Sequence, residues 1–231
     1  MLNNTSLVSQ GWKITESSLS QFTNHNGIFQ DGVLAFCRDN EGVLWLLAGH
    51  TNLGGISLWK GSSVDDLAKQ CDITYNFLMG RAGEAFQRIS YPDGPLSRGQ
   101  IWPNGLWIDP DDGKFYCFIH NETGWGAMDA SYTAKGQYEG EPDFRHIGLM
   151  TSVDRGESWD FEGWVITSHE PCWTVQYCPD GVKGGQKMRE VNLGAGDFSL
   201  YVNDRDGYLY IFYTQMLWNP AKNQYLDFLY A

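Results

Sequence analysis

The chain has 231 residues and a formal net charge of −12, and 42% of its residues are hydrophobic and 15% aromatic. That length allows one large domain with a sizeable core. The acidic balance would repel a phosphate backbone and no basic stripe offsets it, so we expect no nucleic-acid partner. No run of apolar residues has the length of a membrane span, so we expect no membrane partner either.

The first residues have neither the basic region nor the apolar region of a signal peptide, and the five cysteines form no CxxC pattern. Cys37 and Cys117 lie inside apolar, strand-like runs, where a free cysteine behaves as a small hydrophobe. Cys172 and Cys178 could pair across a loop. These features indicate neither a metal site nor a cofactor, and they leave the cellular compartment open.

Three strand–turn–strand units repeat along the chain, at residues 33–49, 104–120 and 198–214. Each joins a short apolar strand to an aromatic-rich one through a polar turn that ends on Gly42, Gly113 or Gly207. Such turns predict β-hairpins with glycine at the tight position. The aspartates clustered in them could instead form calcium loops, but no bidentate glutamate follows, so turn hydrogen bonding is the favoured interpretation.

Further apolar segments extend each hairpin to a larger sheet. Third strands are expected at 56–60, 147–150 and 226–231, and fourth strands at 73–78 and 164–168. Repeated four-stranded antiparallel units with long loops between them predict an all-β fold, a β-propeller. We place blade 1 at about 28–80, blade 2 at about 102–170 and an incomplete blade 3 at about 196–231, in a single partial domain. Closed propellers have about four blades or more, so either the chain is part of a longer protein, which we favour, or partner chains complete the ring.

Residues 152–159 read Ser-Val-Asp-Arg-Gly-Glu-Ser-Trp, which has the form S-x-D-x-G-x-x-W. Ser152 and Asp154 can bind backbone groups of a turn, Gly156 can take a positive φ, and Trp159 can fold back as an apolar plug. The pattern resembles the Asp-box of sialidase-like and other carbohydrate-active propellers, and Ser-Val-Asp at 63–65 resembles a degenerate copy. An ordinary polar hairpin is the alternative. In both interpretations the segment is structural, and candidate catalytic groups lie elsewhere.

A second resemblance comes from residues 196–210, Gly-Asp-Phe-Ser-Leu-Tyr-Val-Asn-Asp-Arg-Asp-Gly-Tyr-Leu-Tyr. They are similar to the D-P-S-x-F-x-D-D-D-G-x-x-Y-L stretch of five-bladed glycoside hydrolases, the arabinanase/β-xylosidase and invertase-like families. Residues 102–113 support the same superfamily, whereas Phe198 stands where proline is usual. The resemblance implies a five-bladed ring, cleavage of O-glycosidic bonds in a poly- or oligosaccharide, and an extracellular or periplasmic location.

By position, the resemblance implies catalytic roles for three acids. Asp31 matches the base or nucleophile on the first blade, and Asp197 matches a second carboxylate that tunes a pKa or holds the substrate. Glu122 is the candidate acid, unless that group lies outside this chain. Glycoside cleavage needs two carboxyl groups with separated pKa values on either side of the bond. The alternatives are a turn for Asp31, a strand-start cap for Asp197 and a solvated loop for Glu122.

Strand alternation predicts that the long loops and the starts of the first strands share one face, opposite the 152–159 hairpin. Aromatic rings there can stack on sugars while polar groups bind hydroxyls. The candidate substrate-binding residues on this face are Trp102, Asn104, His120, Trp125 and His50. The expected partner is a carbohydrate substrate, and the oligomeric state is left open.

Three other functions compete with the hydrolase. One is a non-catalytic carbohydrate-binding propeller, and another is a purely scaffolding propeller. The third is a sialidase-like exo-glycosidase, which would need an arginine cluster to grip a carboxylate. Of the arginines outside the hairpin turns, those able to reach the candidate face are Arg81, Arg88, Arg98, Arg145 and Arg189.

Overall fold

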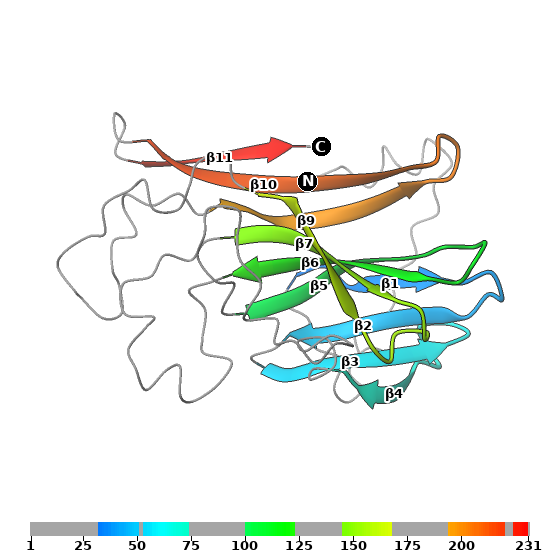
Figure 1. Cartoon of the computed structure of the whole chain (residues 1–231). Helices are drawn as coiled ribbons and strands as arrows, with labels where there is room; N and C mark the ends of the chain where they lie inside the picture. The colour runs from blue at the N-terminus through cyan, green and yellow to red at the C-terminus, as the bar shows by residue number, and fades with distance from the viewer. Residues whose placement is uncertain are drawn as a thin grey trace, which may run out of the picture.

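The computed structural model describes residues 32–50, 53–73, 100–122, 145–167, 194–219 and 224–230. All regular secondary structure in these ranges is β-strand, and none of them holds a helix with the length and apolarity of a membrane span. The described strands form antiparallel sheets that stack on one another (Figure 1). Asp31 and Trp125 lie outside the described residues.

Blade 1 is a four-stranded meander of β1 (Ala35–Arg38), β2 (Leu44–His50), β3 (Leu53–Gly61) and β4 (Ala68–Asp72). The fourth strand was expected at 73–78, and that expectation is wrong for this blade because β4 ends at Asp72. Its sequence, Ala-Lys-Gln-Cys-Asp, is mostly exposed and polar, so a search for apolar runs passes over it. Residues 74–78 lie outside the described ranges.

Blade 2 has the same meander: β5 (Gln100–Ile108), β6 (Phe115–Glu122), β7 (Arg145–Ser152) and β8 (Asp160–Ile166). Strand β8 begins at Asp160, before the expected start at 164. The reason is the fully buried Trp159, which closes the preceding turn, so that the strand resumes directly after it.

Blade 3 has three described strands, β9 (Gly194–Asn203), β10 (Tyr208–Asn219) and β11 (Gln224–Tyr230), paired antiparallel. One parallel pair, Arg145 with Gly194, joins β9 to β7 of blade 2. The ladder therefore continues from blade 2 into blade 3 at the end where β7 and β9 begin.

Apolar side chains fill the space between consecutive sheets. Leu47, Leu58 and Phe115 belong to one buried cluster between blades 1 and 2, and Phe118 and Phe198 belong to another between blades 2 and 3. Strand β5 contacts both β1 and β9, so the first strands of the three blades pack in series. This face-to-face stacking of antiparallel sheets confirms the all-β, propeller-type fold class.

Blades 2 and 3 approach closely at Gly105, where an added Cβ would lie 2.8 Å from the Cβ of Leu200. Real Cβ atoms do not come so near one another, so a glycine is required here. The contact brings the backbone of β5 directly against a side chain of β9, which is how two inner strands meet at a blade boundary.

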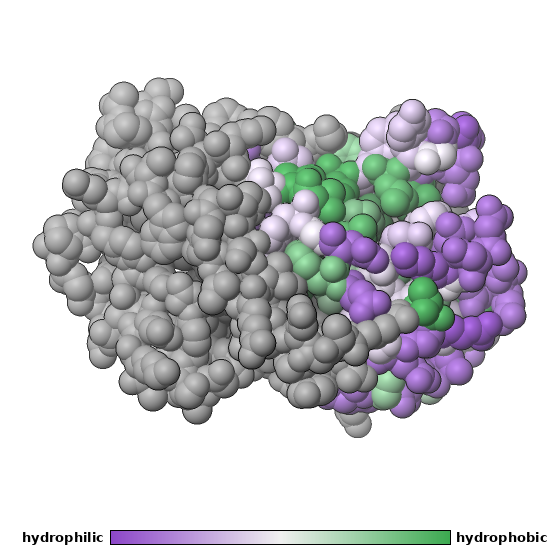
Figure 2. Space-filling view, viewed as in Figure 1, coloured by the Kyte–Doolittle hydropathy of each residue, from purple (hydrophilic) through white to green (hydrophobic). Residues whose placement is uncertain are grey.

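The predicted hairpin turns are present, and Gly42, Gly113 and Gly207 have positive φ angles of 81°, 74° and 75°. Their aspartates bind the turn backbone: Asp39 Oδ1, for example, accepts from the Val43 N–H at 2.9 Å. No group of three His, Cys, Asp or Glu side chains in the described ranges could hold a metal ion. Turn chemistry therefore accounts for these aspartates. The turns gather on the right in Figure 1, and Figure 2 shows that this edge is largely hydrophilic.

The 152–159 hairpin has the hydrogen bonds that its sequence predicts. Ser152 Oγ accepts from the Gly156 N–H at 2.9 Å, and Asp154 Oδ1 accepts from the Ser158 N–H at 2.9 Å. Gly156 has φ 87°, and Trp159 donates from Nε1 to the Gly156 carbonyl at 2.8 Å. The carboxylate, the glycine and the tryptophan thus close one compact turn.

The related turn in blade 1 is closed by a different residue from the one expected. Asp66, rather than Asp65, accepts from the backbone and hydroxyl groups of Ser62 and Ser63. The Ser62 hydroxyl and these backbone bonds lower the pKa of Asp66 from 3.8 to about 2. Asp66 accepts from Ser62 and Ser63, which precede it, whereas Asp154 accepts both from Ser152 before it and from Ser158 after it, so the two turns do not share one geometry.

The thiols of Cys37, Cys71 and Cys117 are free. Burial raises the pKa of the Cys117 thiol well above its ordinary value, as expected for a cysteine that packs as a small apolar group. Cys172 and Cys178 lie outside the described residues.

Candidate functional site

The candidate site and the 152–159 hairpin lie at opposite ends of β7. Arg145 begins that strand opposite Glu122, and Ser152 ends it opposite Phe115. Seven rises of about 3.3 Å separate the two ends by roughly 23 Å. We call the end with Arg145 and Glu122 the strand-start face and the end with the hairpin turns the turn face. The predicted separation of these two faces is confirmed.

His120 is the centre of the described strand-start face. It lies on β6, is 3% exposed, and pairs across the sheet with Trp102 of β5. The two rings meet edge to face, with centroids 5.3 Å apart. The backbone N–H of Asp197 donates to His120 Nδ1 at 3.1 Å. Because Nδ1 accepts this bond, the neutral imidazole carries its proton on Nε2.

Gly196 allows blade 3 to reach this histidine. A Cβ at Gly196 would lie 2.3 Å from His120 Cε1 and 3.2 Å from the Cβ of Arg145. Only a residue without a side chain fits between the two, so the glycine sets the position of the next residue, Asp197. Thr214 on β10 donates from Oγ1 to the Gly196 carbonyl at 3.0 Å and holds the segment from its other side.

Asp197 has an unusual backbone and a defined ion pair. Its φ is 45°, in the left-handed region that residues other than glycine rarely occupy. Its Oδ2 lies 2.9 Å from Nη1 of Arg145, whose side chain is 16% exposed against 61% for the aspartate. The ion pair fixes one side of the carboxylate and leaves the rest open to solvent. Strained backbone of this kind concentrates at functional sites.

Asn104 and Asp197 both lie where the ladder between a first and a second strand is interrupted. In blade 2 the register shifts between Pro103 and Gly105, so Asn104 is the additional residue. In blade 3 it shifts where Asp197 and Phe198 face the single residue Tyr213. Bulges of this kind redirect side chains and are frequent beside active sites. Both bulges therefore contain a polar residue, but the register places Asn104 level with Phe198 and Asp197 level with Pro103, one position apart.

The first described residue of blade 1 also reaches this position. Gly32 has φ 122°, and a Cβ added to it would lie 3.8 Å from Oδ1 of Asn104. The start of blade 1 is thus adjacent to the bulge of blade 2. Asp31, the residue directly before Gly32, lies outside the described residues.

The remaining predicted residues are placed only by their backbones. Glu122 ends β6, opposite Gln100 on one side and Arg145 on the other. His50 ends β2, where its pairing with β3 is irregular at Gly54 and Leu53. The catalytic and binding roles assigned to all of these residues stay predictions.

The site assignment from sequence did not include Arg145 or Gly196. Arg145 was considered only as an arginine for a sialidase-type cluster, and no local pattern ties it to an aspartate 52 positions later. Gly196 stands directly before Asp197 in the stretch that carries the family resemblance. A glycine preceding a polar strand start was therefore a usable signal of close approach.

The described groups of the strand-start face differ in exposure. Trp102 and His120 are buried, at 7% and 3% exposed, and so pack the inner strands together. The Asp197 carboxylate is 61% exposed, and it is the group of this set that a ligand can reach as a hydrogen-bond acceptor. One carboxylate, that of Asp197, has a described side-chain position among the three acids predicted to be catalytic.

No protein-family model and no curated protein matches the chain. Among the solved structures that resemble it weakly are two arabinan-cleaving enzymes. An endo-1,5-α-L-arabinanase from Thermotoga petrophila is 13% identical with a TM-score of 0.36, over 86% of this chain and 43% of that one. An endo-arabinase from Bacteroides thetaiotaomicron is 11% identical with a TM-score of 0.32, over 86% of this chain and 74% of that one. The chain thus spans less than half the length of the first arabinanase.

Proposed function

We propose that the chain is part of a glycoside hydrolase-like propeller that acts on O-glycosidic bonds of a poly- or oligosaccharide through its strand-start face. The observation that carries the proposal is Asp197. It has a left-handed backbone on a bulge, its carboxylate is paired with Arg145, and its N–H is bound to the buried His120. Groups from β6, β7 and β9 meet there, as in a site assembled from consecutive blades.

In this proposal Asp197 holds the substrate rather than transferring a proton. Its ion pair with Arg145 orients the carboxylate, which is 61% exposed and can accept hydrogen bonds from sugar hydroxyls. Asp31 would act as base or nucleophile and Glu122 as acid, the roles that follow from the family resemblance. Register supports a place for Glu122 near the site, since its backbone pairs with that of Arg145.

A non-catalytic carbohydrate-binding propeller is the second candidate. The same ion pair supports it, because a carboxylate oriented by an arginine can bind sugar hydroxyls without taking part in cleavage. The two candidates predict the same binding site and differ only in turnover.

The test is calorimetric titration of the chain with arabino-, xylo- and fructo-oligosaccharides, beside an assay for released reducing ends. The Asp197→Asn variant keeps the size and the backbone conformation, since asparagine tolerates a positive φ, but it loses the charge. We expect it to weaken binding by about tenfold, as for the loss of a charge-assisted hydrogen bond. Asp204→Asn, in the exposed turn of the same blade, is the matched control and should bind like the parent chain.

We expect the chain to bind at least one of these sugars, and the reducing-end assay then decides between the hydrolase and the binding module. Efficient turnover by this chain would make Glu122 the leading acid. A longer protein that contains this chain and binds oligosaccharides without cleaving them would establish the binding module. If no oligosaccharide binds, or if Asp197→Asn binds as well as Asp204→Asn, the proposed site is wrong.

A further inference from the structure

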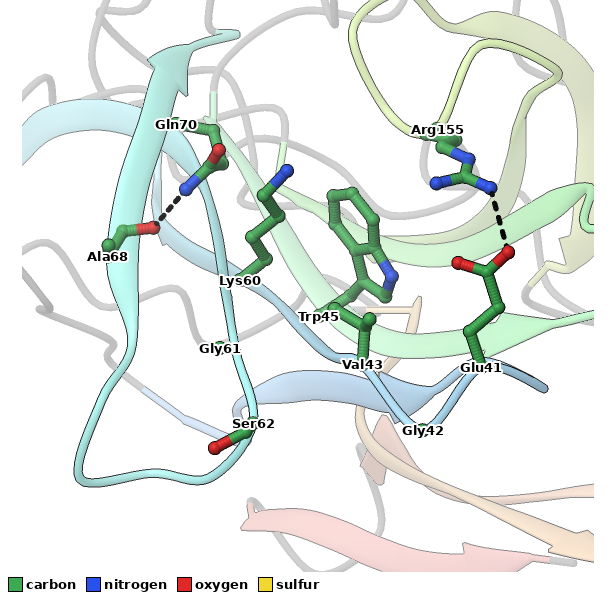
Figure 3. A pocket seen from close by; sticks show the side chains of 10 residues that line it. All are labelled: Glu41, Gly42, Val43, Trp45, Lys60, Gly61, Ser62, Ala68, Gln70 and Arg155. Carbon is green, nitrogen blue, oxygen red and sulfur yellow. Dashed lines mark hydrogen bonds and ion pairs between the residues drawn. The ribbon is translucent and has the colours of Figure 1, made fainter.

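A separate pocket lies on the turn face, at the boundary between blades 1 and 2 (Figure 3). It has a volume of about 560 Å³. Its walls come from the first and last turns of blade 1 and from the 152–159 hairpin of blade 2. The lining residues are Glu41, Gly42, Val43, Trp45, Lys60, Gly61, Ser62, Ala68, Gln70 and Arg155.

Two cations border this pocket. Lys60 Nζ lies 5.5 Å from the centroid of the Trp45 ring, and Arg155 Nη2 lies 3.6 Å from Glu41 Oε1. Figure 3 shows the Lys60 and Arg155 side chains extending on either side of the Trp45 ring. An anion bound in this pocket would meet positive charge from both blades.

The ion pair with Glu41 still allows the Arg155 guanidinium to bind a ligand. The side chains of Arg155 and Glu41 are 63% and 61% exposed. An ion pair with this much exposure to water is weak. Arg155 also has φ 60°, within the turn closed by Ser152 and Asp154. Its backbone is therefore held in place by the hairpin, and its planar guanidinium has donors left for a second carboxylate.

The charge of the lining selects the kind of anion. Among the lining residues, Lys60, Arg155 and Glu41 leave one net positive charge, and the nearby carboxylates of Asp39 and Asp66 are bound to Trp45 and Ser62. A singly charged carboxylate would neutralise that charge, whereas a doubly charged phosphate would leave excess negative charge beside Glu41. Around the cations, Val43 and Ala68 supply apolar surface, and the amide oxygen of Gln70 can accept from a ligand hydroxyl, since its nitrogen binds Ala68.

We propose that this turn-face pocket binds a carboxylate-bearing ligand between Lys60 and Arg155. A free small carboxylate and the uronic-acid unit of a saccharide share this chemistry. The proposal does not depend on the strand-start site, which lies at the other end of the blades.

Three probes, titrated into the isotope-labelled full chain and followed by NMR, test the ligand class. Methyl β-D-glucuronide should shift the amide signals of Lys60, Gln70 and Arg155, and methyl β-D-glucoside, which lacks only the carboxylate, should not. Sodium acetate separates the two sources: binding as tight as that of the glucuronide assigns the pocket to free carboxylates, and binding about tenfold weaker assigns it to uronic acids. Equal binding of glucoside and glucuronide, or no binding of any carboxylate, overturns the proposal.

Charge variants test the geometry, and the altered side chains are exposed on the surface. Lys60→Gln should weaken glucuronide or acetate binding by about fivefold or more, because it removes one of the two cations. Glu41→Gln should strengthen binding by about two- to fivefold, because it frees Arg155 from a competing carboxylate. Lys69→Gln changes the same charge on β4 outside the pocket and should have no effect. Weaker binding in Glu41→Gln, or equal losses in Lys60→Gln and Lys69→Gln, would contradict a site between Lys60 and Arg155.

Discussion

The two ends of the same blades differ in the contacts that shape them. On the turn face the hydrogen bonds that close the turns join near neighbours, such as Asp154 with Ser158, four positions apart, and Asp39 with Trp45, six apart, while contacts such as Asn40 with Pro110 link one turn to another. On the strand-start face the defining hydrogen bonds join distant residues: His120 lies 77 positions from Asp197, and Arg145 lies 52 positions from it.

Because of this difference, we expect changes at the two ends of β7 to affect different properties: stability at the turn face and ligand binding at the strand-start face. A turn closed by its own side chains forms wherever its sequence occurs, so changes there should alter the free energy of unfolding and leave the strand-start site intact. A site made of β6, β7 and β9 exists only when blades 2 and 3 are docked, so changes there should alter ligand binding and blade docking together.

The largest effect is expected at Trp159, a turn-face side chain that reaches the core. Trp159 is fully buried and meets the Phe115 ring at 6.4 Å between centroids. Trp159→Ala should lower the free energy of unfolding by about 3–5 kcal/mol, measured by urea denaturation. Trp159→Phe retains a ring and loses the bond to the Gly156 carbonyl, so it should cost clearly less. Equal losses in the two variants would show that packing is not the main contribution.

A smaller effect is expected where the two blades meet. Gly196→Ala should cost about 1–3 kcal/mol because the new Cβ overlaps His120 Cε1. The loss should shrink when His120→Ala is also present, since the overlapping atom is gone, and a double-mutant cycle measures that coupling. Additive losses would mean that Gly196 is required for another reason. Oligosaccharide binding should weaken in Gly196→Ala, because Asp197 moves with the strand.

Asp154→Ala tests whether the turn face is independent of the candidate site. It removes the acceptor of the Ser158 backbone bond and the partner of the Ser152 hydroxyl. The free energy of unfolding should fall by about 1–2 kcal/mol, and oligosaccharide affinity should not change. A binding defect in the folded variant would show that the two faces are coupled.

The smallest effect is expected in the pH dependence of stability, through the titration of Asp66. The pKa of Asp66 is lowered to about 2, foremost by the Ser62 hydroxyl. A lowered folded-state pKa means that the turn stabilises the protein fully above about pH 4 and loses this contribution as the pH falls through about 2. NMR of the Asp66 carboxyl carbon should give a midpoint near 2, and Ser62→Ala should move it toward 3.8. An unchanged midpoint in that variant would assign the shift to the backbone bonds alone.

Much of the fold could be predicted from local patterns, and the errors have physical causes. The three hairpins and their positive-φ glycines are as expected, because a two-strand turn is specified by its own residues. Strand β4 was missed because an exposed outer strand lacks the apolar run that identifies inner strands. Asp66 closes the blade 1 turn where Asp65 was expected to do so. Two adjacent aspartates offer the same chemistry, and only the turn geometry selects between them.

The sequence by itself determined the turn face. Ser152, Asp154, Gly156 and Trp159 lie within eight positions, and their bonds need nothing beyond that hairpin. The tertiary structure decided the strand-start face, because the partners of Asp197 come from other strands and Gly196 is needed only where His120 lies against it. Hydrogen bonding within a turn is fixed by side chains a few residues apart. The approach of two blades is fixed by shape, which emerges only when the blades pack together.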